Sequence, residues 1–373
     1  MVNSFYPPWV GGAERYVSSL SKELVKRGND VTVYCSGRPL SAGASLEDGV
    51  RVVRLRTPMM LYGTPLVVFP KSFFAERYDV VHANFPSPYL AAVSAFAGAL
   101  KRTPAVLTWH NDLPPVSLGA SVLVGLHSAV SPLYLDHFQR IIATTGVYAR
   151  RSETLRRYRD RVTVIPNGVD TRKFNPGVNG DPVRERYGLR GKVVLFVGAL
   201  TRWHGYKGLD VLLKAFRTVK DRLGDARLVV VGDGPMRDVY EGLAREYGLG
   251  SSVTFAGYAD DSTLPLYYAA CDLLVLPSKD SSEGFGLVLL EAMASGKAVI
   301  GTKVGGITEV IKDSENGVIV NPHDFDALVI AIVLLLEDDN VRRRMGANGR
   351  RFAELNDWSH VAAEVERLYA ELQ

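Results

Sequence analysis

Residues 277–296 read PSKDSSEGFGLVLLEAMASG, and this stretch decides the fold. The apolar run 273–276 precedes it, the glycines of GFG form a turn, and the remainder has the composition of a buried helix. A strand, a glycine-rich turn and a helix in this order are typical of βα units on a parallel sheet. Glycine lets backbone N–H groups approach a ligand closely, and a helix N-terminus favours an anion. The stretch therefore predicts an α/β fold with a phosphate-type site at the carboxyl end of one strand.

The same alternation of short β-branched runs and longer amphipathic segments continues toward both ends of the chain. It predicts a mainly parallel sheet in each half, with helices such as 13–26 and 88–100 between the strands. Only Met1 and Val2 precede the loop-like NSFYPPWVGG, so the first strand is expected to be either unusually short or cut short by the choice of start codon, and the sequence leaves both open. The expected strands are 30–35, 50–55, 79–83, 105–109, 140–143 and 162–165, followed by 193–197, 227–231, 253–255, 273–276, 298–301 and 317–320.

The chain has 373 residues, and a single hydrophobic core stops growing at roughly 250 to 300. Between the two series of strands lies PNGVDTRKFNPGVNGDPVRERYG (166–188), which is dense in Pro, Gly, Asn and Asp and is typical of a linker. We therefore predict two Rossmann-like, doubly wound domains, 1–175 and 176–355, which face each other across a cleft. The final stretch, 356–373, is expected to be a helix that crosses back onto the first domain.

Composition and motifs exclude several classes of protein. Apolar residues make up 47% and charged residues 23%, which argues against disorder and coiled coils. The longest apolar run, 327–336, is shorter than the ~20 residues of a spanning helix, and we expect no signal peptide. Two distant cysteines provide no disulfide framework, so a reducing cytoplasm is expected. The absence of GxxxxGK[ST], GxSxG, HExxH and paired CxxC excludes P-loop, α/β-hydrolase, zinc-protease and zinc-ribbon proteins.

Charge is distributed unevenly between the two halves. Residues 1–175 contain 21 Lys and Arg against 12 Asp and Glu, a net charge of +9, whereas the remaining residues carry −5. Six arginines fall between Arg150 and Arg161, and such a cluster attracts anionic lipid headgroups or an acidic acceptor. A solvated helix face is the alternative interpretation. No nucleic-acid recognition motif accompanies the cluster, so we expect no nucleic acid as partner.

Two carboxylates flank the GFG turn. Glu291 is the only charged residue in 284–295, and a carboxylate in such apolar surroundings needs donors, which two ribose hydroxyls would supply. Glu283 precedes the turn, near the backbone of Gly284 and Gly286. Alternatively, Glu291 lies on a narrow solvated stripe and Glu283 is an ordinary turn residue. The residues by themselves leave both interpretations open.

A second candidate site lies in 196–216, FVGALTRWHGYKGLDVLLKAF, which again predicts a strand, a loop and a helix. Arg202 and Lys207 stand in the loop and at the helix start, where the macrodipole disfavours a cation unless an anion is bound. Fixed cations aimed at a departing diphosphate would stabilise its developing charge, by about 3–4 kcal/mol for one well-placed donor. A metal would then not be required. A surface position for Lys207 is the alternative.

Further candidates are less specific. Gly232 and Gly234 follow a strand, but GDGPMR lacks the third glycine of a dinucleotide fingerprint. Gly11 and Gly12 precede a helix, and His110 follows a buried strand, where it is either structural or directed into the cleft. Asp324 and Asp326 form a DxD pattern that metal-dependent transferases use, but they start a helix and are better explained as capping residues.

Taken together, these segments resemble a family 4 glycosyltransferase of the GT-B fold. The resemblance covers nearly the whole chain and rests on the order of GGAERYVSSLSKELVKRGNDVTVY, DVVHAN, VIPNGVD, KGLDVLLKAF, VVGDGP, VTFAGYADDSTLPLYYAACDLLVLPS, EGFGLVLLEAMASG and VGGITEVI. It implies a retaining, metal-independent transferase that needs no cofactor and uses a UDP-, GDP- or ADP-sugar. The implied acceptor is a saccharide or a lipid-linked molecule bound by the first domain.

The resemblance also assigns roles to residues. Lys207 and Arg202 would bind the diphosphate, Glu291 the ribose, Glu283 the donor sugar, and His110 the sugar near its anomeric centre. The implied catalytic residues are His110, Arg202, Lys207 and Glu283, and the implied donor-binding residues are Gly11, Gly12, Gly232, Asp233, Gly234, Glu283, Gly284, Phe285, Gly286, Leu287 and Glu291. One departure concerns Ala199, which follows Gly198 where the family commonly has Arg, and Arg202 is expected to substitute.

Two other functions remain compatible with these residues. The first is a nucleotide-sugar epimerase of the same fold, and the second is a catalytically silent protein that binds sugar nucleotides. The expected location is the cytoplasm, with peripheral contact to an anionic membrane through 150–161.

Overall fold

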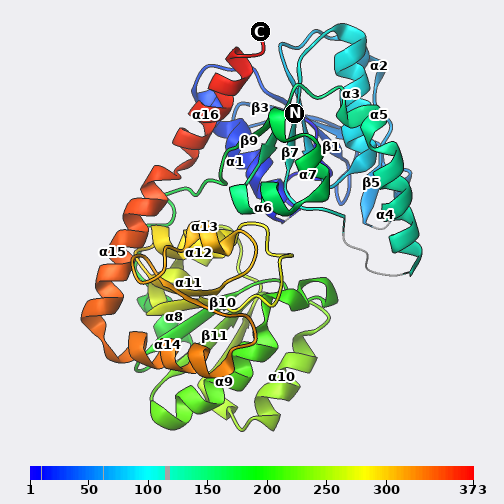
Figure 1. Cartoon of the computed structure of the whole chain (residues 1–373). Helices are drawn as coiled ribbons and strands as arrows, with labels where there is room; N and C mark the ends of the chain where they lie inside the picture. The colour runs from blue at the N-terminus through cyan, green and yellow to red at the C-terminus, as the bar shows by residue number, and fades with distance from the viewer. Residues whose placement is uncertain (10, 62, 114–117) are drawn as a thin grey trace. The chain divides into compact units, whose positions relative to one another are not determined.

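The computed structural model describes residues 1–9, 11–61, 63–113 and 118–373 (Figure 1). Its contacts divide the chain into two compact units, Met1–Gly168 with Trp358–Gln373, and Val169–Asp357. Residues 169–175, expected in the first domain, belong to the second unit because Val169 and Phe174 are buried in its core. Residues 356 and 357, expected in the final helix, also belong to it, since Asp357 forms a bridge with Val169.

The second unit is built on one parallel sheet of six strands in the order β12-β11-β10-β13-β14-β15. Numbered along the chain, this order is 3-2-1-4-5-6, which is the Rossmann arrangement. Ligands of such sheets bind at the carboxyl ends of the strands where the order reverses, here between β10 and β13. The strands are β10 (Val193–Val197), β11 (Arg227–Val231), β12 (Val253–Gly257), β13 (Leu273–Leu276), β14 (Ala298–Thr302) and β15 (Val318–Val320).

Helices join these strands and supply most of the remaining core. Their apolar faces, such as Leu212, Leu213 and Phe216, contribute to the core around the central strands β10, β13 and β14, which are buried along their whole length, as expected for a sheet covered on both faces. The helices are α8 (Asp181–Arg186), α9 (Leu209–Arg222), α10 (Arg237–Glu246), α11 (Leu264–Ala270), α12 (Leu287–Ala294), α13 (Ile307–Val310), α14 (Phe325–Glu337) and α15 (Asp339–Leu355), with 3-10 turns η2 (Arg202–Lys207) and η3 (Gly250–Ser252).

The first unit repeats this plan around a very short first strand. Val2 bridges Tyr34 on one side and Ala83 on the other, and thereby joins the order β2-β3-β1 to β6-β7-β8-β9. The strands are β1 (Thr32–Ser36), β2 (Gly43–Glu47), β3 (Val50–Leu55), β6 (Val81–Phe85), β7 (Ala105–Trp109), β8 (Arg140–Ala143) and β9 (Val162–Val164), and a separate hairpin holds β4 (Met59–Leu61) and β5 (Thr64–Leu66). The order reverses between Val2 and β6.

The C-terminal helix returns to the first unit, as predicted. Helix α16 (Trp358–Ala370) packs on α1 (Gly12–Lys26), and the two helices share a core that contains Tyr16, Leu20, Val361 and Val365. The other helices of this unit are α2 (Lys71–Ala75), α3 (Pro88–Lys101), α4 (Leu118–Val130), α5 (Pro132–Leu135), α6 (Gly146–Arg151) and α7 (Glu153–Arg157), with the 3-10 turn η1 (Arg159–Arg161). No helix among the described residues is long and apolar enough to cross a bilayer.

Besides the domain bounds, the structure corrects the predicted elements, because strands β2, β4 and β5 and helix α8 were not predicted. Strand β2 pairs antiparallel with β3, and it was missed because its side chains are largely exposed and show no apolar alternation. The segment predicted to be an irregular linker contains α8, which packs on α11 through the buried Val183.

Candidate functional site

Lys207 and Glu283 form a buried ion pair beside the switch point of the second unit. Lys207 ends η2, in the connection after β10, and Glu283 lies in the connection after the neighbouring β13. The Lys207 Nζ is 2.8 Å from the Glu283 Oε2, and the two side chains are only 14% and 8% exposed. Ser278 Oγ donates to the same carboxylate oxygen at 3.3 Å. Two of the predicted site residues are therefore in direct contact.

The charge of Lys207 depends on its surroundings. Burial would lower the pKa of the ammonium, but attraction to Glu283, together with Tyr206 and the hydrogen bond to Glu283, raises the pKa above its usual value. The Glu291 carboxylate contributes in the same direction, which places it within electrostatic range of the ammonium. Lys207 is thus a permanent cation, held in place where it can attract an anionic ligand.

Two glycines keep the connections around this pair close together. Gly208 follows Lys207 with φ +75°, and a Cβ there would lie 2.1 Å from the Pro277 carbonyl oxygen. Gly305 has φ +48°, and its Cβ would lie 1.9 Å from the carbonyl oxygen of Glu283. No side chain fits at either position without displacing backbone. Glycine at these two positions therefore allows the backbone segments on both sides of the ion pair to approach each other closely.

Glu291 lies on α12 and is 6% exposed, so the solvated stripe considered for it is wrong. Its Oε2 accepts a hydrogen bond from the Tyr268 hydroxyl at 2.6 Å. Since Glu291 also acts on Lys207, the structure brings Lys207, Glu283 and Glu291 into one cluster. Carboxylates with such environments accept hydrogen bonds from hydroxyl groups.

Arg202 differs from Lys207 in its exposure. It begins η2 as an exposed residue, and no hydrogen bond or ion pair joins it to Glu283 or Glu291 in the described part of the chain. Ala199 is exposed, and the stem of Lys207 covers Gly198, where a Cβ would lie 2.9 Å from the lysine Cδ. The structure therefore places Lys207, and not Arg202, within the buried cluster.

The glycines after β11 shape the neighbouring connection. A Cβ on Gly232 would lie 1.9 Å from the Gly198 carbonyl oxygen, and one on Gly234 would lie 2.3 Å from that of Leu200. Asp233 is exposed, its carbonyl accepts from the Leu200 N–H at 2.9 Å, and its side chain accepts from the Gly234 N–H at 2.8 Å. These contacts hold the connections after β10 and β11 together.

The residues of the GFG turn differ in burial, since one side chain lies in the core and the backbone beside it is partly exposed. Phe285 is buried in the hydrophobic core, Gly286 has φ +86° and caps α12, and Leu287 is the first residue of that helix. Gly284 and Leu287 are partly exposed. The Phe285 side chain therefore packs in the interior, whereas the backbone around it remains accessible at Gly284.

His110, Gly11 and Gly12 belong to the first unit. His110 follows β7, and its Nε2 lies 3.1 Å from Oδ1 of Asn84 on β6. Burial lowers the pKa of His110 to about 4, so the imidazole is neutral at pH 7. The ring of Tyr16 meets it edge-on, with centroids 4.8 Å apart. His110 thus lies beside the switch point of its own sheet.

Gly11 lies against the buried carboxyl group of Glu14. Gly11 caps α1 and Gly12 is its first residue, while a Cβ on Gly11 would meet Oε2 of Glu14 at 2.2 Å. Burial raises the pKa of Glu14 to about 7, although a hydrogen bond with its own backbone N–H acts in the opposite direction. Gly11 therefore accommodates a carboxyl group that changes charge near neutral pH.

Four residues of these clusters were not predicted from the sequence, namely Tyr268, Ser278, Asn84 and Glu14. Ser278 follows the same strand as Glu283, and Asn84 lies near the end of a strand, so their positions at carboxyl edges were a usable signal. Tyr268 lies in the middle of α11, where nothing in the sequence marks it.

The preferred interpretation of the two aspartates as capping residues holds for Asp324 and not for Asp326. Asp324 caps α14 by accepting from the Ala327 N–H at 3.0 Å, and Asp326 lies in the first turn. Within residues 1–9, 11–61, 63–113 and 118–373, no group of three or more His, Cys, Asp or Glu side chains is arranged to hold a metal ion.

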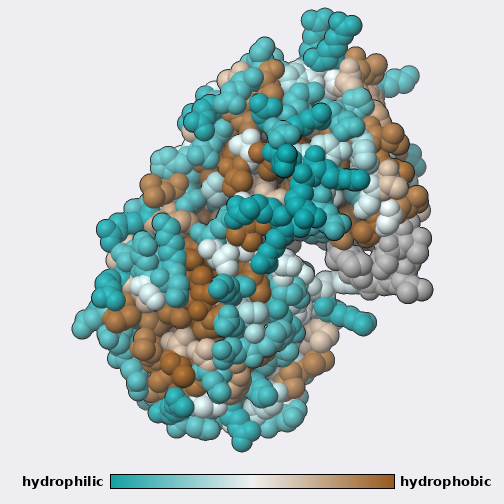
Figure 2. Space-filling view, viewed as in Figure 1, coloured by the Kyte–Doolittle hydropathy of each residue, from teal (hydrophilic) through white to brown (hydrophobic). Residues whose placement is uncertain are grey.

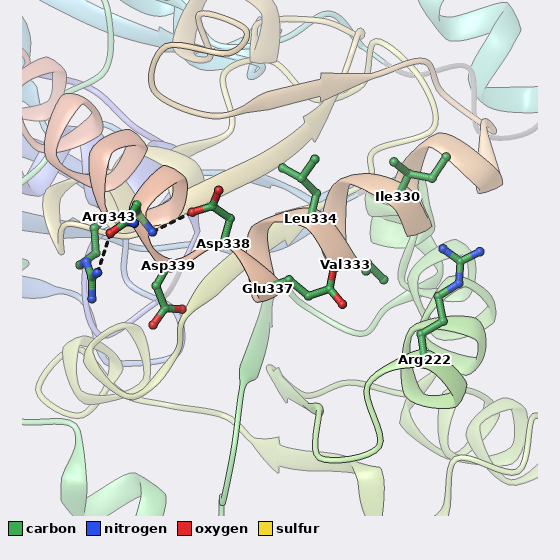
Figure 3. Close-up of a pocket in the computed structure, with 9 residues that line it drawn as sticks. Arg222, Ile330, Val333, Leu334, Glu337, Asp338, Asp339 and Arg343 are labelled. Carbon is green, nitrogen blue, oxygen red and sulfur yellow. Dashed lines mark hydrogen bonds between the residues drawn. The ribbon is translucent and has the colours of Figure 1, made fainter.

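A pocket of about 650 Å³ lies elsewhere in the second unit (Figure 3). Arg222 approaches it from the end of α9, Ile330 and Leu334 line it from α14, and acidic residues follow at the start of α15. It contains none of the predicted site residues. Its lining offers no cluster comparable with Lys207, Glu283 and Glu291.

Comparison with known protein families gives two matches that together cover most of the chain. Residues 10–173 match the model of Glycosyltransferase Family 4, and residues 183–352 match that of glycosyl transferases group 1. A GDP-mannose-dependent alpha-(1-6)-phosphatidylinositol monomannoside mannosyltransferase of Mycolicibacterium smegmatis is 30% identical, over 96% of this chain and 94% of its own length. The O-antigen chain mannosyltransferase C of Escherichia coli is 29% identical, over 99% and 96%.

Solved structures show the same architecture. Sucrose-phosphate synthase from Thermosynechococcus elongatus superposes with a TM-score of 0.77 at 27% identity, and the match covers 99% of this chain and 95% of that one. HepE from Anabaena, solved with UDP-glucose, also gives 0.77, at 22% identity over 99% and 98%, and supports the fold alone. The predicted GT-B fold with its two α/β domains is confirmed.

Proposed function

The chain belongs to the family 4 (group 1) glycosyltransferases, which transfer sugars from nucleotide-sugar donors, and we propose that it is a retaining, metal-independent member with a saccharide or lipid-linked acceptor. The relatives named above act on an O-antigen chain and on a phosphatidylinositol mannoside, which supports an acceptor of this class. The observation that carries the proposal is the buried contact between Lys207 and Glu283 at the switch point.

The ion pair supplies the charge that the reaction needs. When the bond between the anomeric carbon and the diphosphate breaks, negative charge develops on the leaving phosphate oxygen. Lys207 is proposed to stabilise that charge, an effect of about 3–4 kcal/mol for a well-placed group. The acceptor hydroxyl attacks from the same face and passes its proton to the leaving phosphate. This route requires neither a protein nucleophile nor a metal.

The neighbouring carboxylates are proposed to orient the donor. Glu291, buried and within electrostatic range of Lys207, would accept hydrogen bonds from the ribose hydroxyls. Glu283 and the Gly284 backbone would bind the donor sugar and its phosphate, with Gly232 and Gly234 shaping the adjoining connection. Arg202, exposed at the start of η2, is proposed as an auxiliary cation for the diphosphate.

In the first unit, His110 is proposed to contact the donor sugar and Gly12 the diphosphate. Burial keeps His110 neutral at pH 7, which supports a role as a hydrogen-bonding group and argues against a role as a cation. A neutral imidazole offers one donor and one acceptor.

The donor is tested first by thermal stabilisation with UDP-, GDP- and ADP-sugars, because a ligand of the folded state raises apparent stability. Release of nucleoside diphosphate and formation of glycosylated product are then measured with the stabilising donor. An interconverted sugar nucleotide without product would instead support the epimerase, and binding without turnover the silent protein. Anomeric coupling constants of the product test retention, and EDTA tests metal independence.

A second part of the proposal is contact with an anionic membrane through the arginines of 150–161. Arg151 and Arg157 are exposed, and Arg161 donates to the Asp136 carbonyl at 2.8 Å, which links this segment to α5. Leu133 on α5 is 69% exposed, and hydrophobic side chains gather over α3 and α5 (Figure 2). Basic and apolar groups side by side are suited to a lipid surface.

Co-sedimentation with vesicles tests this part. Binding should require anionic lipid, decrease with salt, and be reduced by Arg151→Glu with Arg157→Glu. The double change Arg343→Glu with Arg344→Glu, at exposed positions of the second unit, is the control of equal charge and should bind like the wild type. Equal binding to neutral and anionic vesicles would contradict the proposal.

A further inference from the structure

Asn84 is a buried residue that links the shortened first strand to His110. It is 2% exposed and lies near the end of β6, directly beside Val2 at the switch point of the first unit. Its side-chain Nδ2 donates to the Val2 carbonyl oxygen at 3.2 Å, and its Oδ1 faces Nε2 of His110 at 3.1 Å.

The chemistry of these atoms determines which of them carry hydrogen. A peptide carbonyl can only accept, so the amide group of Asn84 that faces Val2 must be its NH2. The remaining amide oxygen, also only an acceptor, faces the imidazole, and therefore Nε2 of His110 must donate. We propose that Asn84 is a positioning residue that holds His110 as the Nε2–H tautomer, which leaves Nδ1 as an acceptor for a sugar hydroxyl.

The second ring nitrogen is available for this role. No described residue forms a hydrogen bond with Nδ1 of His110, and the His110 residue is partly exposed. The ring of Tyr16 packs edge-on against the imidazole and restricts its rotation. A fixed, unprotonated nitrogen on a partly exposed residue is a specific binding group.

The class of ligand follows from the same chemistry. An unprotonated nitrogen accepts from O–H and N–H groups, and it has no attraction for the oxygens of a phosphate diester or a diphosphate. A sugar hydroxyl fits this requirement. The inference rests on the proposed function in this respect only, because the tautomer itself depends on Asn84 and not on the reaction.

The tautomer can be measured directly. Long-range ¹H–¹⁵N correlation spectra of the full chain with ¹⁵N-labelled histidine distinguish protonated from bare ring nitrogens, and the spectrum of His110→Gln identifies the His110 signals. The wild type should show a protonated Nε2 and a bare Nδ1 at pH 7. Asn84→Ala should give a mixture of both tautomers. An Nδ1–H tautomer in the wild type, or an unchanged signal in Asn84→Ala, would overturn the inference.

Kinetics separate positioning from simple loss of stability. Asn84→Ala should lower kcat/KM about tenfold, because this is the effect expected from losing one hydrogen bond to the substrate. Asn84→Asp places an oxygen where the NH2 met the Val2 carbonyl, so the carboxyl group should keep the Nε2–H tautomer and the activity only while it is protonated and donates to Val2. Once it ionises it raises the pKa of His110, and because the imidazolium no longer accepts, activity should be lost at a pH at which the wild type remains active. Asn316→Ala, which removes another buried asparagine, should change neither the His110 signal nor the pH profile.

Other groups near His110 must be considered in the pH profile. The pKa of Tyr16 is raised to about 12 by burial, with a lowering by Thr108, and that of His82 is lowered to about 3 by burial, so neither titrates near pH 7. Glu14, on the same helix as Tyr16, has a pKa of about 7, and the profile is therefore recorded also in Glu14→Gln. If the predicted tautomer is found without transferase activity, the inference stands and the proposed function fails.

Discussion

The Lys207 ammonium and the Glu283 carboxylate lie 2.8 Å apart, although the two residues are separated by 76 positions in the sequence. They follow β10 and β13, the two strands between which the order of the sheet reverses. A bound diphosphate would take over part of the interaction of Lys207. In the proposed mechanism, the ion pair keeps the cation ordered until the donor binds.

Removing one partner of the pair should be costly. Lys207→Met leaves a buried carboxylate unpaired and should lower the free energy of unfolding by about 3–5 kcal/mol. The double variant Lys207→Met with Glu283→Gln should recover most of that stability but no activity. Chemical denaturation and donor turnover measure the two effects.

Lys279→Met provides the control for this comparison. Its partner Asp210 lies 3.3 Å away, and both side chains are partly exposed, so the cost should be below about 1 kcal/mol. Equal stability of Lys207→Met and the double variant would contradict a buried ion pair.

Gly305→Ala should displace the Glu283 connection, because its Cβ would lie 1.9 Å from the Glu283 carbonyl oxygen. Donor affinity should decrease in addition to stability, as measured by donor titration. Gly188→Ala is the matched control, since Gly188 has φ +59° with nothing within 4 Å of a Cβ. It should cost about 1–2 kcal/mol of backbone strain and leave donor binding intact. The prediction fails if both variants bind the donor equally well.

Tyr268→Phe removes a donor from the Glu291 carboxylate. The loss should be about 1–3 kcal/mol, because a buried acceptor loses a partner, and the KM for the donor should rise. The neighbouring Tyr267→Phe breaks the contact with the Tyr187 hydroxyl at 3.1 Å and should affect stability alone. An unchanged donor KM in Tyr268→Phe would separate Glu291 from the donor site.

Glu14→Gln should change how stability depends on pH. The pKa of Glu14 is raised by burial from 4.5 to about 7, so the folded state binds a proton that the unfolded state releases. The contribution of this proton to the free energy of unfolding is on the order of 3 kcal/mol. It is fully present below pH 4.5 and is lost as the pH rises through 7. The amide removes this loss, so Tm should rise relative to the wild type at pH 8 and much less at pH 5. The exposed Glu364→Gln is the control and should show no such difference.

Regular elements were largely predictable because their side chains repeat. The strands around Val193–Val197 and Ala105–Trp109 are buried on both faces, and such strands appear in a sequence as continuous apolar runs. Strand β2 was missed because an exposed antiparallel edge needs no apolar side chains, and α8 was missed because its short sequence resembles a linker. Residues 169–175 were assigned to the wrong side of the boundary, since the burial of Val169 and Phe174 depends on contacts far along the chain.

The sequence alone determined the order of the motifs that resemble the family, the plan of two α/β domains, and the choice of Lys207, Glu283 and Glu291 as candidate site residues. These could be predicted because glycines, charged residues and the spacing of apolar residues are local properties of the chain. Only the tertiary structure decided that Lys207 pairs with Glu283, that Glu291 is buried against Tyr268, and that Asn84 meets His110. The physical reason is that burial and hydrogen-bond partners are set by strand order. Strand order brings together residues that no local pattern connects.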